Sequence, residues 1–116
     1  MSGILTFPDD ENGAVLRNMQ LSGDDLSEPR NVDFEHIFPS KESALAFAAA
    51  AMSKTDEVRI SWYDEVRSWN VQVTRHMLPD HGAITSLETL LQGLARKHGG
   101  DSDGWGCLEV RSRRDA

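Results

Sequence analysis

The stretch Asn31-Val32-Asp33-Phe34-Glu35-His36-Ile37-Phe38 decides the fold that we expect for this chain. Every second side chain would point toward a core: Val32, Phe34, His36 and Phe38. The side chains between them, Asp33, Glu35 and Ile37, would point the other way. A period of two is typical of a strand with one buried face. We therefore predict a half-buried strand here, and its polar face is acidic.

The residues that follow this strand predict a helix and then a hairpin. Ser40, after Pro39, is a good N-cap for the alanine-rich run 44–52, whose small side chains let a helix lie close to a sheet. Apolar and polar side chains then alternate over residues 58–63 and again over residues 69–74. The connection 64–68 is short enough to join these two segments as a β-hairpin.

A long amphipathic helix and a last strand are predicted after the hairpin. Pro79 and Asp80 would open the helix, and Gly99-Gly100 would end it. Its apolar stripe advances in steps of three and four residues: Ile84, Leu87, Leu91, Leu94 and His98. After a turn at residues 101–104, residues 107–110 predict a short final strand.

The segment before residue 31 predicts one more helix and an ordered loop. Acids at residues 9–11 suit a helix N-terminus, and Gly23 would end a helix that begins there. Turn-forming residues fill 23–30. The order, a helix and then βαββαβ, predicts an α+β fold: a ferredoxin-like two-layer sandwich with an antiparallel four-stranded sheet and an extra N-terminal helix. The helices would cover one sheet face and leave the other open as a candidate binding surface.

Length and composition predict one soluble domain. A chain of 116 residues with 39% apolar and 27% charged residues is typical of a single globular core. We expect one domain, 1–116, with loose ends at 1–8 and 111–116. The first residues lack the pattern of a signal peptide and no stretch is long enough to span a membrane, so we expect a cytoplasmic protein. The single cysteine, Cys107, agrees with a reducing compartment.

The negative charge is concentrated in the first third of the chain. Residues 1–40 contain eight acids against Arg17 and Arg30, and so carry −6 of the total charge of −7. Such a chain is repelled by phosphates, which argues against direct contact with nucleic acid and favours a basic protein partner. The alternative is that the surplus acid only keeps the protein soluble.

No arrangement of residues predicts catalysis, a cofactor or a metal. A segment that contains proline separates His76 from His81, so the two lack the spacing of a helical metal pair. Cys107 has no basic residue close in sequence, as a nucleophile would need, and a buried structural thiol is the simpler interpretation. Asp24 and Asp25 could pair as carboxylates, but adjacent residues rarely converge on one substrate. Phosphate-binding glycine patterns and nucleophile elbows are absent from the sequence.

The sharpest local feature is Asp103-Gly104-Trp105-Gly106, in which a large aromatic side chain lies between two glycines. In one interpretation Trp105 plugs the end of the sandwich where the last strand begins. In the other it is an exposed anchor for a partner. The sequence leaves both open.

Three features together resemble the RraB family of ribonuclease E inhibitors: the Gly23-Asp24-Asp25 loop, the strand 32–36, and Asp-Gly-Trp-Gly at 103–106. The resemblance runs from about Glu11 to Val110. It implies a non-enzymatic regulator with a ferredoxin-like sandwich that docks on the basic, non-catalytic C-terminal region of ribonuclease E and lowers RNA cleavage. Well-known members continue into a long acidic tail, whereas this chain ends with Arg111, Arg113 and Arg114.

We therefore expect a protein partner, ribonuclease E or another basic protein, bound by a monomer or weak homodimer without a cofactor or metal. The residues that we expect to contact it are Asp24, Asp25, Glu28, Asp33, Glu35 and Trp105. Two alternatives stay open. One is a dimeric module that binds a small ligand on its open sheet, where Arg59, Tyr63, Asn70 and Gln72 could converge. The other is an immunity-like module that guards against a different basic toxin or nuclease.

Overall fold

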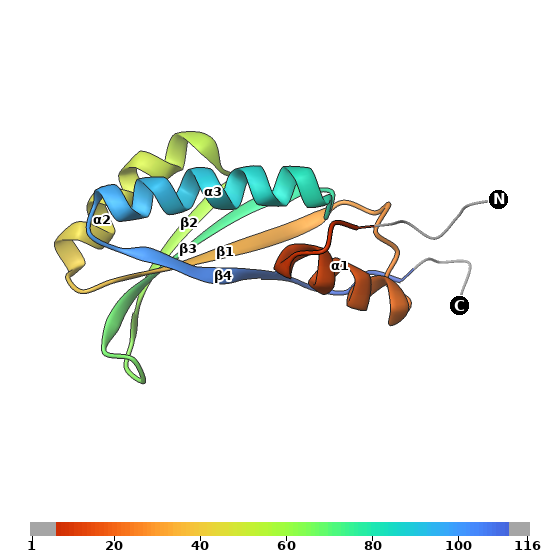
Figure 1. Ribbon diagram of the computed structural model, residues 1–116. Coiled ribbons are helices and arrows are strands. Elements are labelled where there is room, and N and C mark those ends of the chain that lie inside the picture. The colour runs from red at the N-terminus through yellow and green to blue at the C-terminus, as the bar shows by residue number, and fades with distance from the viewer. Residues whose placement is uncertain (1–6, 112–116) are drawn as a thin grey trace.

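The structure, a computed structural model, describes residues 7–111 (Figure 1). Its elements are α1 (Glu11–Leu21), β1 (Arg30–Phe38), α2 (Lys41–Ala51), a short 3-10 helix (Met52–Lys54), β2 (Glu57–Tyr63), β3 (Ser68–Met77), α3 (His81–Lys97) and β4 (Asp101–Cys107). This is the predicted element order. Most of the two loose ends expected at 1–8 and 111–116 lies outside the described residues.

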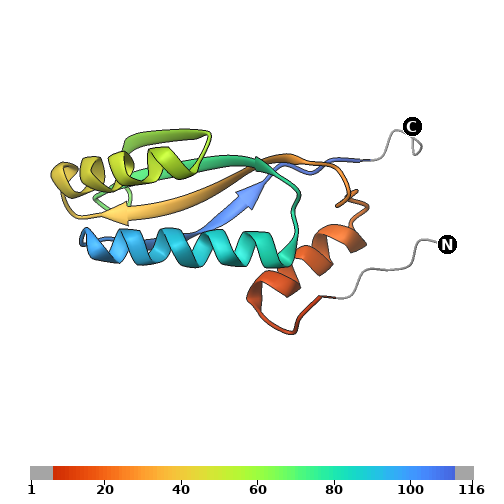
Figure 2. The same ribbon diagram turned by 90° about the horizontal axis from the view of Figure 1, so that it is seen from above.

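The four strands form one antiparallel sheet in the order β2-β3-β1-β4. Helices α2 and α3 pack on one face of this sheet and contact each other. Figure 2 shows these two helices side by side along the sheet. The α+β class and the four-stranded antiparallel sheet are thus confirmed. No helix within residues 7–111 packs on the second face of the sheet.

The core lies between the sheet and the two helices. Strand β1 contributes every second side chain to it, so Phe34, His36 and Phe38 are all about 1% exposed. The ring of Phe47 on α2 lies 4.7 Å from His36 and 5.0 Å from Phe38, measured between centroids. Burial of each large apolar side chain contributes about 1.5–3 kcal/mol. Through Phe34 and Phe38, strand β1 therefore stabilises the packing of the sheet against the helices.

Short polar side chains fix where the three α-helices begin. The carboxylates of Asp10 and Asp80 accept hydrogen bonds from the backbone N–H of Gly13 and Ala83, at 2.7 and 2.9 Å. The Ser40 hydroxyl accepts one from Ser43 N–H at 3.2 Å, so the predicted N-cap is confirmed. Each cap satisfies an N–H group that the helix leaves without a partner and contributes about 1 kcal/mol.

The last strand is where the sequence interpretation is wrong. We expected a turn at residues 101–104 and a strand at 107–110, but β4 runs from Asp101 to Cys107. Phe34 lies opposite Trp105 while His36 lies opposite Ser102, so β4 has one residue more than β1 between these pairs. Gly104, at φ +97°, adopts the left-handed backbone that such a β-bulge needs. Asp and Gly signal a turn locally, but here the same backbone forms a bulge inside a paired strand.

The N-terminal helix packs against the sandwich near β4. Its contact with α3 centres on Asn12, which is buried although polar. The Asn12 side-chain amide donates hydrogen bonds to Thr85 Oγ1 at 3.1 Å and to Glu88 Oε1 at 2.9 Å. These bonds compensate the burial of the amide and orient α1 against α3.

Candidate protein-binding surface

The sheet face without helices, called the open face below, is lined by polar side chains from three strands. The register places Asp33 beside Thr74 and Glu35 beside Gln72 on β1 and β3. On the outer side of β3, Glu57 lies beside Thr74 and Arg59 beside Gln72. Their apolar neighbours Val71 and Val73 point to the core and are fully buried. The predicted alternation on β1 is therefore confirmed, and it brings Asp33 and Glu35 to one surface.

Hydrogen bonds hold the two β1 carboxylates in place. The Thr74 hydroxyl donates to Asp33 Oδ1 at 2.6 Å, and the Asn70 amide donates to Glu35 Oε1 at 3.0 Å. Neither carboxylate forms an ion pair with a basic side chain within residues 7–111. Their charges are thus oriented but not neutralised there, which suits them to meet an external cation.

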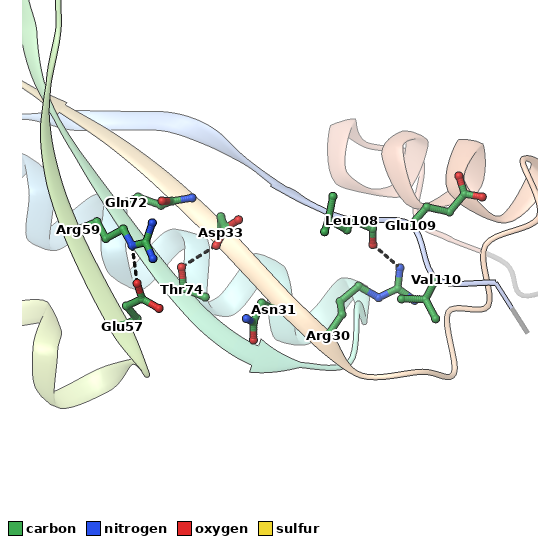
Figure 3. A pocket seen from close by; sticks show the side chains of 10 residues that line it. All are labelled: Arg30, Asn31, Asp33, Glu57, Arg59, Gln72, Thr74, Leu108, Glu109 and Val110. Carbon is green, nitrogen blue, oxygen red and sulfur yellow. Dashed lines mark hydrogen bonds and ion pairs between the residues drawn. The ribbon is translucent and has the colours of Figure 1, made fainter.

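A groove of about 480 Å³ runs along this part of the open face (Figure 3). It is bordered by side chains of β1, β2 and β3 and by the segment after β4: Arg30, Asn31, Asp33, Glu57, Arg59, Gln72, Thr74, Leu108, Glu109 and Val110. Figure 3 shows Arg59 paired with Glu57, which leaves Asp33 as the carboxylate without an ion pair near the middle of the groove.

In the described part of the chain, no group of three or more His, Cys, Asp or Glu residues is arranged to hold a metal.

Arg30, at the start of β1, organises the whole loop before it. Its guanidinium donates to Asp24 Oδ2 at 2.8 Å and to the backbone oxygen of Asp25 at 2.8 Å. It also donates to the backbone oxygens of Glu28 and Leu108, at 3.2–3.3 Å and 3.0 Å. The side chains of Arg30 and Asp24 are only 4% and 1% exposed. One buried arginine therefore ties the loop 23–29 to the segment after β4.

These contacts change the interpretation of the predicted loop acids. Asp24 is buried in its ion pair with Arg30, so we correct the expectation that it belongs to the contact surface. Asp25 is half-buried; its carboxylate accepts from the hydroxyl and N–H of Ser27 at 2.6 and 3.1 Å, and these bonds lower its pKa. Of these three acids, only Glu28 is exposed. The loop acts mainly as a scaffold because its polar groups are used internally.

Trp105 lies on the helix side of the sheet and not on the open face. It is half-buried, packs against the core, and its indole nitrogen donates to Asn12 Oδ1 at 2.8 Å. This geometry agrees with the structural interpretation of Asp-Gly-Trp-Gly. We therefore do not count Trp105 among the residues of the open face.

His36, His81 and Cys107 lie in surroundings that suit structural roles. Burial lowers the pKa of His36, whose Nδ1 lies 3.3 Å from the Val71 carbonyl oxygen and donates to it. His81 Nε2 lies 3.0 Å from the Asp10 carboxylate. Burial raises the pKa of the Cys107 thiol, so the thiol stays protonated near neutral pH and is a poor nucleophile.

The sequence did not indicate that Asp103 and Glu57 belong to the open face. The local sequence predicts a turn for Asp103, and Glu57 lies just before the alternating segment 58–63. The bulge turns Asp103 to the solvent; in unbroken pairing it would lie opposite His36, whose side chain points to the core. If the alternation is extended back to residue 57, it places Glu57 on the open face. Gly104 is the one residue in the sequence that hints at the bulge.

The fold and this surface define a small α+β protein with one polar, uncovered sheet face, a class suited to binding another molecule across the sheet. No helix in the described residues has the length and apolar character to cross a membrane. The chain belongs to the RraB family, described as regulator of ribonuclease activity B, which matches residues 9–107. The comparison with curated proteins found no match.

Proposed function

We propose that this protein is a non-enzymatic regulator that binds a ribonuclease through its open face and inhibits RNA cleavage. Membership of the RraB family supports a regulator of ribonuclease activity and hence a ribonuclease as partner. The single observation that carries the mode of binding is the pair Asp33 and Glu35, held side by side on the uncovered sheet without an ion pair inside residues 7–111.

The partner segment that fits this surface is flexible and basic. A cationic peptide can lie along a sheet face and place its side chains near both carboxylates, and attraction between opposite charges speeds association. The net charge of −7 strengthens this attraction and opposes contact with RNA phosphates. Glu28, exposed on the loop before β1, extends the negative potential at one end.

The resemblance stated above makes ribonuclease E, through its basic C-terminal region, the specific partner in this proposal. We also propose that the protein acts in the cytoplasm, where a single free cysteine suits the reducing conditions. The sheet order β2-β3-β1-β4 supports the ferredoxin-like arrangement as the frame that leaves the open face free.

Binding to ribonuclease E, with RNA cleavage measured in parallel, tests the proposal. The double variant Asp33→Asn/Glu35→Gln keeps both hydrogen-bond acceptors but removes two charges. We expect its affinity to fall about tenfold, because each exposed charge contact contributes about 0.5–1 kcal/mol. The matched control, Glu11→Gln/Glu42→Gln, removes two exposed charges from the helices and should bind almost as the native protein.

Two results would contradict the proposal. If native protein neither binds ribonuclease E nor slows its cleavage of RNA, the partner is wrong. If both double variants lose the same affinity, only net charge matters and the open face has no special role.

A second function is favoured by the groove in Figure 3. Its volume of about 480 Å³ and its mixture of Arg59, Gln72 and Asn31 suit a small polar ligand. A thermal-shift screen of polar metabolites checks this: a ligand that raises the melting temperature of native protein but not of the Arg59→Gln variant supports it.

A further inference from the structure

A second hollow of about 360 Å³ lies on the open face, nearer the β2–β3 hairpin. It is lined by residues of all four strands: Glu35, Ser61, Trp62, Tyr63, Asn70 and Asp103. Two of these are carboxylates and two are aromatic. This combination differs from the first groove, where Arg59 and Glu57 pair with each other.

The carboxylates of this hollow come from facing positions of β1 and β4. Asp103 lies in the bulge opposite Glu35, between the pairs Phe34–Trp105 and His36–Ser102. Asp103 is exposed, and within the described residues neither it nor Glu35 pairs with a basic side chain. Two like charges on adjacent strands repel each other, so a cation that bridges them is favoured.

The aromatic part of the hollow is on β2. Tyr63 follows Arg59 and Ser61 on the open-face side of the alternation and is 39% exposed. Trp62 is 46% exposed and packs edge-on against Trp69 at 5.4 Å between ring centroids. The end of the β2–β3 hairpin extends beyond the helices α2 and α3 (Figure 1). Exposed aromatic groups of this kind are typical of binding surfaces.

We propose that this hollow binds an arginine side chain of a basic peptide segment. A guanidinium is planar, so it can stack on an aromatic ring such as that of Tyr63, and its N–H groups can pair with carboxylates such as those of Glu35 and Asp103, which line the same hollow. An ammonium group has no plane to stack, and lysine therefore fits less well. The inference rests on the proposed function and deepens it, because it names the side chain that the open face selects.

Two synthetic peptides test the inference on the full chain: one alternates arginine with serine, and the other has lysine at each arginine position. Titration calorimetry gives both affinities, and NMR maps the backbone amides that move. We expect the arginine peptide to bind native protein about fivefold more tightly. The amides of Ser61, Tyr63 and Asn70 should shift, and those of α1 should not.

Single variants show which side chains produce the preference for arginine over lysine. Asp103→Asn and Tyr63→Leu should bring the arginine-to-lysine ratio close to one, whereas Tyr63→Phe, which keeps the ring, should retain it. Glu42→Gln, exposed on α2, is the matched control and should also retain it. Equal affinity of native protein for the two peptides overturns the inference, as does a ratio that Asp103→Asn and Tyr63→Leu leave unchanged.

The outcomes also separate this inference from the proposed function. If ribonuclease binding depends on Asp33 and Glu35 but the peptides show no preference for arginine, the proposed function stands and the arginine hollow is rejected. If neither the ribonuclease nor either peptide binds, both are rejected.

Discussion

The indole nitrogen of Trp105 donates a hydrogen bond to Asn12 Oδ1 at 2.8 Å, joining β4 to a helix 93 residues earlier in the chain. The amide of the same Asn12 donates to Thr85 and Glu88 on α3. One buried side chain therefore connects α1, α3 and β4. This explains why the most specific feature of the sequence, the tryptophan between two glycines, is an internal contact of the fold.

We expect Asn12→Ala to lower the free energy of unfolding by about 1–3 kcal/mol, because it removes the hydrogen bonds of a buried amide and leaves its half-buried partners Thr85, Glu88 and Trp105 without them. Urea denaturation measures the change. Asn18→Ala, on the exposed side of the same helix, is the control and should change stability by less than about 0.5 kcal/mol. Equal changes of stability in the two variants would mean that the hydrogen bonds of Asn12 to Thr85, Glu88 and Trp105 contribute nothing to stability.

We expect Arg30→Met to cost about 3–5 kcal/mol, because it leaves the carboxylate of Asp24 buried without its partner. Adding Asp24→Asn to this variant removes the unpaired charge and should recover part of the loss. Chemical denaturation of the two single variants and the double variant gives the coupling energy. Additive losses would show that the two side chains act independently.

We expect Gly104→Ala to cost about 1–2 kcal/mol, because an L-residue at φ +97° is strained. The matched control is Gly106→Ala, two residues further along β4. An added Cβ meets no atom within 4 Å at either position, and Gly106 does not have a positive φ. Thermal denaturation compares them. A loss at Gly106 as large as that at Gly104 would contradict the role of the bulge.

The buried imidazole of His36 should make stability depend on pH. Burial lowers its pKa in the folded protein, while the unfolded chain takes up a proton near the ordinary pKa of about 6.5. The contribution of His36 is therefore complete above about pH 6.5, and the free energy of unfolding falls as the pH falls below it.

Urea denaturation between about pH 8 and pH 5 measures this slope. A His36→Leu variant should lose the slope in this range. The carboxyl groups of Asp10, Asp25 and Asp101, whose pKa values are lowered, add their own loss only at pH values near or below about 4. An equally steep slope in His36→Leu would assign the effect to another group.

Much of the fold could be predicted because its signals are local. The alternation from Val32 to Phe38 identified the buried and open faces of β1, and Ser40 and Asp80 marked the starts of α2 and α3. The candidate surface was predicted only in part. Asp33 and Glu35 follow from the alternation, but Asp24, an acid of the same type in a polar loop, is buried by an arginine six residues later.

The sequence by itself determined the order of the elements, the two faces of each central strand and the membership of the family. These follow from the spacing of apolar residues, from helix-capping side chains and from turn-forming residues, and each of these signals extends over a few residues. Only the tertiary structure decided which carboxylates reach the surface, where β4 begins and what Trp105 contacts. Those outcomes depend on partners up to 93 residues away, such as Asn12 for Trp105 and Leu108 for Arg30. Whether a polar side chain is buried away from water is decided only when such partners come together in the folded chain.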